Sequence, residues 1–192
     1  GTDCNQVNPA LHFDSCATGQ DFCARWAGGI DEYLNRAVFQ LMPYPSGQGD
    51  GRFYHNWSKF LLSRQAGLQY FGNAIHSLQD FYSHSTWVDL GRTATAPLTG
   101  PTCNPAAFQA PLQTGYYALQ WIAHMGNSGC PVKGPPSQFT YCHSAINKDT
   151  PTSVNGRRCC PAGSDPCGKS GTCHEVAKAI AARATAEAWA EL

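Results

Sequence analysis

The sequence has no surplus of charge of either sign, because thirteen Lys and Arg residues balance thirteen Asp and Glu residues in a chain of 192. Charged residues make up only 14% of it. Proteins that hold duplex DNA or a strongly anionic membrane through bulk electrostatics need a basic excess. The composition therefore argues against stable duplex DNA binding. It remains compatible with a nucleotide or a phospholipid headgroup that is held through a metal ion.

Long apolar runs and alternating apolar and polar segments are also missing. No run approaches the ~20 apolar residues that span a bilayer, so we expect no transmembrane segment. No segment alternates for long enough to predict a sheet. No signal-peptide pattern stands at Gly1, and we expect Gly1 to be a mature terminus. The length of the chain and its 42% of hydrophobic residues predict one globular domain over residues 1–192. Because no segment predicts a strand, we expect this domain to be all-α.

Cysteine, in contrast, is abundant. The chain has ten cysteines, with neighbours at Cys159 and Cys160, and no pair of CxxC knuckles that would indicate a zinc finger. An even and high count predicts up to five disulfides and an oxidising compartment. The sequon at Asn56-Trp57-Ser58 fits the same setting. We therefore predict a secreted, extracellular, disulfide-stapled protein.

Helical periodicity recurs between loops that are rich in Gly and Pro. A break is expected near Gly67 or Gly72, and Ser170 or Thr172 is a candidate cap for the last helix. Residues 127–171 are predicted to form a long irregular excursion that disulfides hold. The predicted helices cover residues 18–42, 56–90, 110–126 and 172–192.

Two histidines and an aspartate stand at helical spacing in the second of these segments. His76, Asp80 and His84 follow one another at i, i+4 and i+8, which places them along one helix face. Neutral imidazole and carboxylate are ligands that Zn²⁺ takes. Three residues over two turns suit two ions, or one ion with a supporting partner. The alternative is that these histidines are ordinary surface or hydrogen-bonded core residues.

The segment Ile75–Gly91, IHSLQDFYSHSTWVDLG, resembles the signature of Het-C-type domains. Two further segments, Leu11–Cys16 and Ala145–Thr150, are similar to that family and stand in the same order. His174 and the alanine-rich segment that follows also match its pattern. Het-C-type domains occur in fungal heterokaryon-incompatibility proteins and beside von Willebrand factor A domains.

Het-C-type domains are in turn similar to the zinc-dependent phospholipase C and single-strand nuclease superfamily. The resemblance implies a helical fold with a zinc cluster, in which His76 and Asp80 match the superfamily's His-x-x-x-Asp. The chain departs from the pattern at three places. His84 lies eight rather than ten residues after His76, Lys178 replaces an expected Glu, and Gly1 replaces an N-terminal Trp. We therefore expect one or two zinc ions rather than three.

The candidate site residues come from the spacing and the resemblance together. Asp14 and Asp80 are the predicted catalytic carboxylates. His124 and His143 are expected to hydrogen-bond locally, and Asp149 to match the family position or cap a turn. The predicted metal ligands are His12, His55, His76, Asp80, His84 and His174.

The implied function is metal-dependent hydrolysis of a phosphodiester bond. Zinc lowers the pKa of bound water toward ~7 and stabilises charge on a phosphoryl oxygen. Asp14 or Asp80 would accept the proton from that water. The expected substrates are a phospholipid, as for a phospholipase C, or a nucleic acid, as for a nuclease.

Two alternatives remain open at the level of the sequence. A muramidase-like glycoside hydrolase would cleave cell-wall glycan with the paired carboxylates of Asp14 and Asp80. A non-catalytic recognition or toxin module would keep the fold without the reaction. An open coordination position at a bound metal ion separates a working site from a purely structural one.

Overall fold

The computed structural model describes residues 12–41, 53–98, 102–115, 137, 139–158 and 171–190, and the side chains of residues 53–62 lie outside this description. The β structure in this part of the chain consists of isolated bridges, one of them between Ser85 and Thr114. The predicted all-α class is confirmed. Among the described residues, no helix is long and apolar enough to cross a membrane. The elements are α1 (Gly19–Trp26), η1 (Ala27–Asp31), α2 (Glu32–Leu41), α3 (Phe53–His84), η2 (Pro105–Phe108), α4 (His143–Ile146) and α5 (Cys173–Ala190).

The first helical stretch is α1, η1 and α2, which follow one another without a gap. Thr18 begins it with a capping box, in which its hydroxyl accepts from the Asp21 amide and the Asp21 carboxylate accepts from the Thr18 amide at 2.8 Å. These bonds satisfy two amides that the first turn leaves without helical partners. η1 is a π-helical turn, which adds one residue to the local winding. The helix predicted over residues 18–42 is therefore confirmed from Gly19 to Leu41, the last described residue of this stretch.

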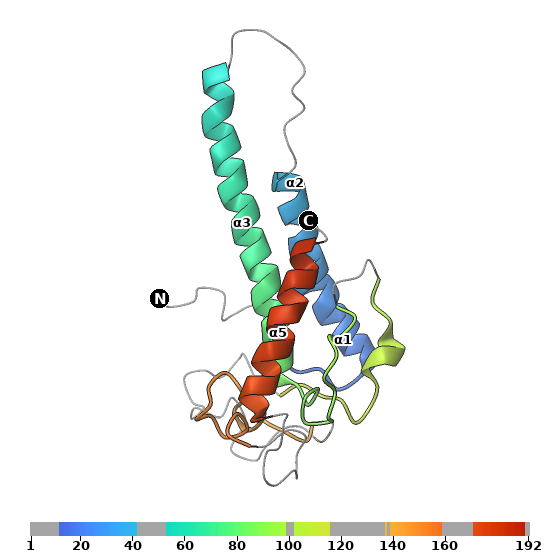
Figure 1. Cartoon of the computed structure of the whole chain (residues 1–192). Coiled ribbons are helices and arrows are strands. Elements are labelled where there is room, and N and C mark those ends of the chain that lie inside the picture. Colours follow the sequence, from blue (N-terminus) through green and yellow to red (C-terminus); the bar gives the residue numbers. More distant parts are fainter. Residues whose placement is uncertain are drawn as a thin grey trace, which may run out of the picture.

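The long helix α3 is the central element, and α2 and α5 both pack against it (Figure 1). The break that we expected near Gly67 or Gly72 is wrong, because α3 is continuous from Phe53 to His84. Gly67 serves a different purpose. A Cβ at this position would lie 2.7 Å from Cγ of Leu41, so the glycine lets α2 approach closely.

α3 ends at His84 rather than near residue 90, and contacts from distant segments explain this. The Gly115 amide donates to the His84 carbonyl at 3.0 Å. The Lys148 amide donates to the Ser83 carbonyl at 3.1 Å, and its ammonium donates to the Ser85 carbonyl at 2.7 Å. The last carbonyls of a helix need such partners. The segments around residues 115 and 148 therefore terminate α3 and are held at its end.

Packed aromatic rings form the core beside this end of α3. Phe22 stacks on Phe108 with ring centroids 5.3 Å apart, and Phe81 meets Phe13 edge to face at 5.3 Å. Tyr82 is also buried, and its hydroxyl accepts from the Ala96 amide at 2.8 Å. Burial raises the pKa of Tyr82 above its usual range. These contacts fix the core-facing side of α3 directly after Asp80.

A disulfide joins Cys23 of α1 to Cys103, and Cys142 and Cys173 are also disulfide-bonded. The disulfide-stapled class is therefore confirmed. Cys16 is a free, buried thiol, so the ten cysteines form at most four disulfides within the chain, which is below the predicted upper limit of five. Burial raises the pKa of Cys16 to about 12. Its thiol packs in the core instead of forming a cross-link.

The remaining predicted segments have mixed outcomes. Thr172 caps α5 through a reciprocal pair of bonds with Glu175, and the helix predicted over residues 172–192 is confirmed from Cys173 to Ala190, where the described residues end. Residues 110–115 are not helical, so that part of the helix predicted over 110–126 is wrong. Residues 116–126 lie outside the described residues.

Candidate metal centre

The last turns of α3 place two histidines around one carboxylate. The Nε2 atom of His76 lies 3.6 Å from Oδ2 of Asp80, and Nδ1 of His84 lies 3.9 Å from the same oxygen. These distances follow from the i, i+4 spacing on an unbroken helix. The sequence prediction that the three side chains share one face is therefore correct.

The N-terminal segment adds a third imidazole to this carboxylate. His12 Nδ1 lies 3.0 Å from Asp80 Oδ2 and 3.4 Å from His76 Nε2. Phe13 and Ser15, on either side of Asp14, have left-handed backbone angles, with φ of 47° and 60°. Such angles are strained for residues with a Cβ and are kept where the surroundings fix them. The segment is thereby turned so that His12 and Asp14 both reach the end of α3.

A second set of contacts surrounds His84. Its Nε2–H donates to the Asp149 carboxylate, with both oxygens at 3.1 Å. The ring of His143 lies 4.0 Å from the ring of His84, centroid to centroid, and His143 Nδ1 lies 2.8 Å from Asp14 Oδ1. Residues from three distant parts of the chain thus meet here. We refer to His12, Asp14, His76, Asp80, His84, His143 and Asp149 as the histidine–aspartate cluster.

Within the cluster, three groups of three residues offer ligand atoms that all lie within 4.8 Å of one another in each group. The outer triad is His12, His76 and Asp80, and its side chains are 17%, 41% and 13% exposed. The inner triad is Asp14, His84 and His143, with 4%, 5% and 20% exposed. A third overlapping group joins His84 to Asp80 and Asp149. The cluster therefore has a solvent-facing side and a buried side.

The electrostatics of the cluster are set by its carboxylates. Burial lowers the pKa of His84, but the hydrogen bond to Asp149 and the charges of Asp80 and Asp14 outweigh it and raise the pKa to about 9. For Asp149, burial acts in the opposite direction and by itself would raise the pKa of the carboxyl group. The hydrogen bond from His84 and that imidazole's charge hold it well below its usual range instead. A positive charge, whether a proton or a metal ion, is therefore favoured at this place.

The predicted site residues separate clearly in the structure. His12, Asp14, His76, Asp80 and His84 come together. His174 does not join them, because its Nδ1 is bonded to the Lys148 carbonyl at 2.8 Å. The side chain of His55 lies outside the described residues.

Ligand roles for His143 and Asp149 did not follow from the sequence. Neither has a periodic partner nearby in the sequence, and both reach the cluster only because their loop packs on the end of α3. The sole signal was the Asn147-Lys148-Asp149 segment, which we had interpreted as a family match or a turn cap.

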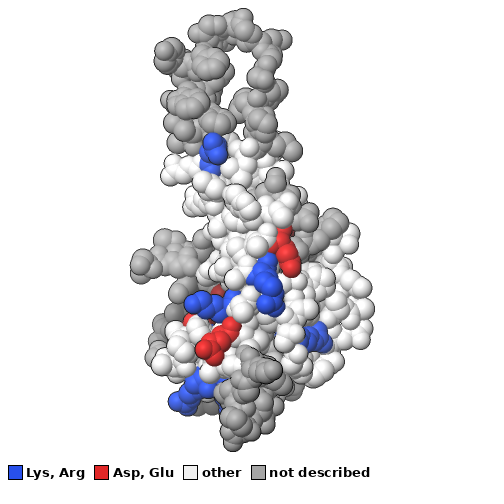
Figure 2. Space-filling view, in the orientation of Figure 1, with Lys and Arg blue, Asp and Glu red and all other residues white. Residues whose placement is uncertain are grey.

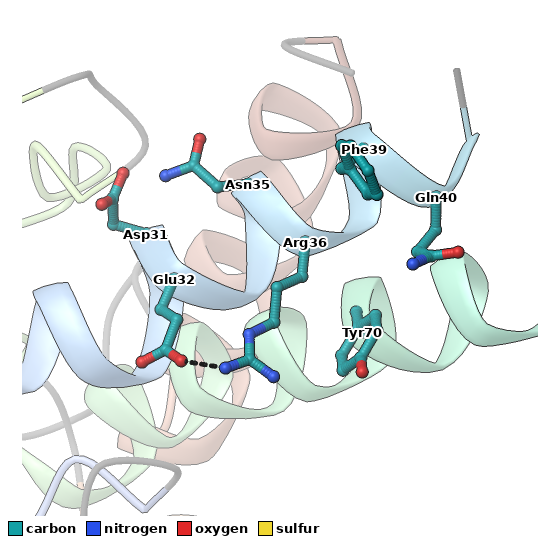
Figure 3. Close-up of a pocket in the computed structure, with 7 residues that line it drawn as sticks. All are labelled: Asp31, Glu32, Asn35, Arg36, Phe39, Gln40 and Tyr70. Atoms are coloured by element: carbon teal, nitrogen blue, oxygen red, sulfur yellow. Dashed lines mark hydrogen bonds and ion pairs between the residues drawn. The ribbon is translucent and has the colours of Figure 1, made fainter. Parts of the chain in front are cut away.

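A separate pocket of about 580 Å³ lies between α2 and α3 and shares no residue with the cluster (Figure 3). Glu32 and Arg36, which both line it, form an ion pair at 2.5 Å, and the Arg36 guanidinium lies 5.6 Å from the Tyr70 ring. Exposed pairs of this kind contribute little to stability. The pocket is lined by Asp31, Glu32, Asn35, Arg36, Phe39, Gln40 and Tyr70.

The charged residues on the face shown in Figure 2 are few and of mixed sign, and they are spread among neutral residues. This agrees with the balanced composition of the chain. A surface of this kind does not steer a highly charged partner over long distances. Recognition on this face would depend on local contacts.

Comparisons with known proteins replace the resemblance stated above. A family model described as the VWA7 N-terminal domain matches residues 57–107. Human von Willebrand factor A domain-containing protein 7 is 33% identical over 90 residues, which cover 47% of this chain and 8% of that protein. The chain thus spans only a small part of the relative that it matches. No solved structure matches it.

The proposed likeness to Het-C-type domains and to zinc-dependent phospholipase C is therefore wrong. The family model that matches the segment containing His76, Asp80 and His84 describes the VWA7 N-terminal domain, and not a Het-C-type or phospholipase C domain. The metal-dependent phosphodiesterase function and the hydrolase and phospholipase C-like assignments rested on that likeness and fall with it. Over residues 57–107, which include most of α3, this chain is similar to the N-terminal domain of VWA7.

Proposed function

We propose that this chain is an extracellular, non-enzymatic recognition module that contacts its partner through a Zn²⁺ ion held by the outer triad, His12, His76 and Asp80. The observation that carries this proposal is the spacing of the three ligand atoms. They are separated by 3.0, 3.4 and 3.6 Å. In a tetrahedral site with Zn–N and Zn–O bonds of about 2.0–2.1 Å, neighbouring ligand atoms lie about 3.3 Å apart.

The donor set also fits zinc rather than a harder cation. Two imidazole nitrogens and one carboxylate oxygen are typical zinc ligands, whereas Ca²⁺ and Mg²⁺ prefer oxygen alone. Three protein ligands leave a fourth tetrahedral position. His76, with its side chain 41% exposed, lies on the solvent-facing side. The fourth position would therefore face outward, toward a partner.

A recognition role also fits the state of the two carboxylates that had been expected to act as bases. Asp80 Oδ2 is surrounded by three imidazoles at 3.0, 3.6 and 3.9 Å. Asp14 is 4% exposed and lies 2.8 Å from His143. A general base, or one member of a glycosidase pair, needs to reach a water or a substrate proton. Both carboxylates are instead committed to histidines.

Bound Zn²⁺ would supply an electrophilic centre that accepts an oxygen ligand, such as the carboxylate of an acidic side chain on the partner. The chain itself does the rest. α3 fixes His76 and Asp80 at one turn's separation, and the strained segment around Asp14 brings His12 over them. The disulfide between Cys23 and Cys103 supports an oxidising, extracellular setting.

The test uses cobalt as a spectroscopic substitute for zinc. The Co²⁺-loaded protein is titrated with acetate, a carboxylate probe, and its visible absorption is recorded. We expect a tetrahedral spectrum that changes on addition of acetate, and loss of this response in His76→Ala. Gln79→Ala is the matched control, because Gln79 lies on the same helix and its side chain bonds Thr185 instead.

Two results would contradict the proposal. The first is a folded wild-type protein that takes up neither Zn²⁺ nor Co²⁺. The second is zinc-dependent hydrolysis of bis(4-nitrophenyl) phosphate that is abolished in His76→Ala, since turnover would make the site catalytic.

A further inference from the structure

The inner side of the cluster contains a buried imidazole nitrogen that has no hydrogen-bond partner among the described residues. This atom is Nδ1 of His84. The side chain is only 5% exposed, so water does not readily replace a missing partner. Its nearest carboxylate oxygen, Oδ2 of Asp80, is 3.9 Å away, which is too far for a hydrogen bond. A group that bonds this nitrogen therefore belongs in the gap.

The other nitrogen of His84 determines what kind of group that is. Its Nε2–H donates to both oxygens of Asp149 at 3.1 Å. In the neutral ring this leaves Nδ1 with an unshared electron pair. A carboxylate that holds the far nitrogen of an imidazole is the arrangement found behind metal-ligating histidines, where it fixes the tautomer and the ring orientation. Asp149 has this relation to His84.

Two more ligands lie on the same side. Asp14 is buried, and its Oδ1 is 2.8 Å from His143 Nδ1, while the His143 ring lies 4.0 Å from the His84 ring. Ligand atoms of these three residues lie within 4.8 Å of one another. Nitrogen, nitrogen and oxygen again match zinc.

The charge of the whole cluster favours more than one cation. Asp14, Asp80 and Asp149 contribute three carboxylates, and the ion pairs that they make with the described residues are all with histidines. Neutral imidazoles, the form that binds metal, leave these charges uncompensated. A second divalent ion compensates them where buried charge is most unfavourable.

We propose that Asp14, His84 and His143 form a second, buried zinc site, oriented by Asp149, that joins the N-terminal segment, the end of α3 and α4 into one unit. The role of this site is to link these three segments rather than to contact a partner. It is distinct from the solvent-facing outer triad and does not depend on the recognition role of that triad. Its ligands are enclosed, so its ion exchanges slowly, whereas the ion at the outer triad exchanges quickly.

Elemental analysis and zinc release test this inference together. The full chain, purified without chelator, is expected to contain two zinc ions and to release them to a chromogenic chelator in a fast phase and a slow phase. His143→Asn is expected to retain one ion, to lose the slow phase and to keep the acetate response of the Co²⁺-loaded protein. His76→Ala is expected to lose the fast phase and to keep the slow one.

Asp149→Asn provides a second variant that keeps all three ligands, in case His143→Asn does not fold. It should weaken the slowly exchanging ion by roughly 10- to 100-fold. One zinc ion in the wild type, with release unchanged in His143→Asn or in Asp149→Asn, would overturn the second site and leave the outer triad standing. A metal-free wild type would overturn both, so the two failures are distinguishable.

Discussion

Asp80 is the residue that connects the two sides of the cluster. Its Oδ2 lies 3.0 Å from His12, 3.6 Å from His76 and 3.9 Å from His84. The core holds it in this place, because Phe81 and Tyr82, the next two residues, are fully buried. A carboxylate so placed serves as a zinc ligand and also balances the charge of the imidazoles around it.

Asp80→Asn tests this role at constant side-chain size. The amide keeps the shape of the carboxylate but loses its charge and is a poor zinc ligand. Zinc affinity should fall by more than the roughly 10–100-fold that follows loss of an orienting partner. Competition with a chelator of known affinity measures it. Asp31→Asn, remote from the cluster, should leave the affinity unchanged. Unaltered affinity in Asp80→Asn would remove Asp80 from the ligand set.

At the scale of the element, the end of α3 is held by a buried ion. The Lys148 side chain is fully buried, and its ammonium pairs with Asp89 at 3.0 Å while donating to the carbonyls of Ser85 and Ile146. Burial lowers the pKa of Lys148, and the charge of Asp89 counters this shift. The neighbouring Asp149 thereby reaches His84.

Lys148→Met should lower the free energy of unfolding by about 3–5 kcal/mol, because it leaves Asp89 partly buried without its counter-ion. Denaturant unfolding monitored by circular dichroism measures the change. Lys178→Met, at an exposed position of α5, is the control and should have little effect. The double variant Lys148→Met/Asp89→Leu should recover part of the loss. A single variant as stable as the wild type would contradict the role assigned to this pair.

The capping box at the start of α1 gives a prediction about pH. Burial raises the pKa of Asp21, but bonds from Thr18 and from the backbone amides of Ala17 and Thr18 outweigh this effect and lower it. A depressed pKa contributes stability that is present above the unfolded-state value and is lost as pH falls through the folded value. Thr18→Ala should lower the free energy of unfolding by about 1 kcal/mol at neutral pH. The loss should be smaller once the pH falls below the folded-state pKa of Asp21. Thermal unfolding at several pH values checks this, and an unchanged cost in acid would contradict it.

Local patterns predicted the helices well where neighbours in the sequence determine them. The stretch from Gly19 to Leu41, the run of α3 and the capped start of α5 all follow from periodicity and caps. The end of α3 does not, because its carbonyls bond Lys148, which is 63 residues from Ser85. Gly67 was taken for a break because the sequence alone does not show that Leu41 packs against it.

The candidate site divides along the same line. His76, Asp80 and His84 are recognisable because helical spacing places them on one face. His143 and Asp149 have no such local relation, and only the packing of their loop on α3 brings them to Asp14 and His84. The part of the site that rests on one helix was therefore predictable, and the part that rests on tertiary contacts was not.

At the scale of the whole molecule, the disulfide and the cluster connect different parts of the chain. Cys23–Cys103 closes a sequence separation of 80 residues and fixes α1 to the segment before η2. The cluster joins residues 12–14, the end of α3 and residues 143–149, none of which are neighbours in the sequence. The disulfide and the cluster therefore link different sets of segments.

Their contributions to stability should therefore be separable. Zinc at 100 times its dissociation constant should raise the free energy of unfolding by about 2.7 kcal/mol for each occupied site, because zinc binds only to the folded chain. The variant Cys23→Ala/Cys103→Ala should lose about 2–5 kcal/mol. Chelator and the double variant should lower the free energy of unfolding additively, as expected for distant sites. Denaturant unfolding of both proteins, with zinc and with chelator, measures all four values. A chelator effect that vanishes in the double variant would show that the disulfide assembles the cluster, because the ligands would then meet only when α1 is fixed.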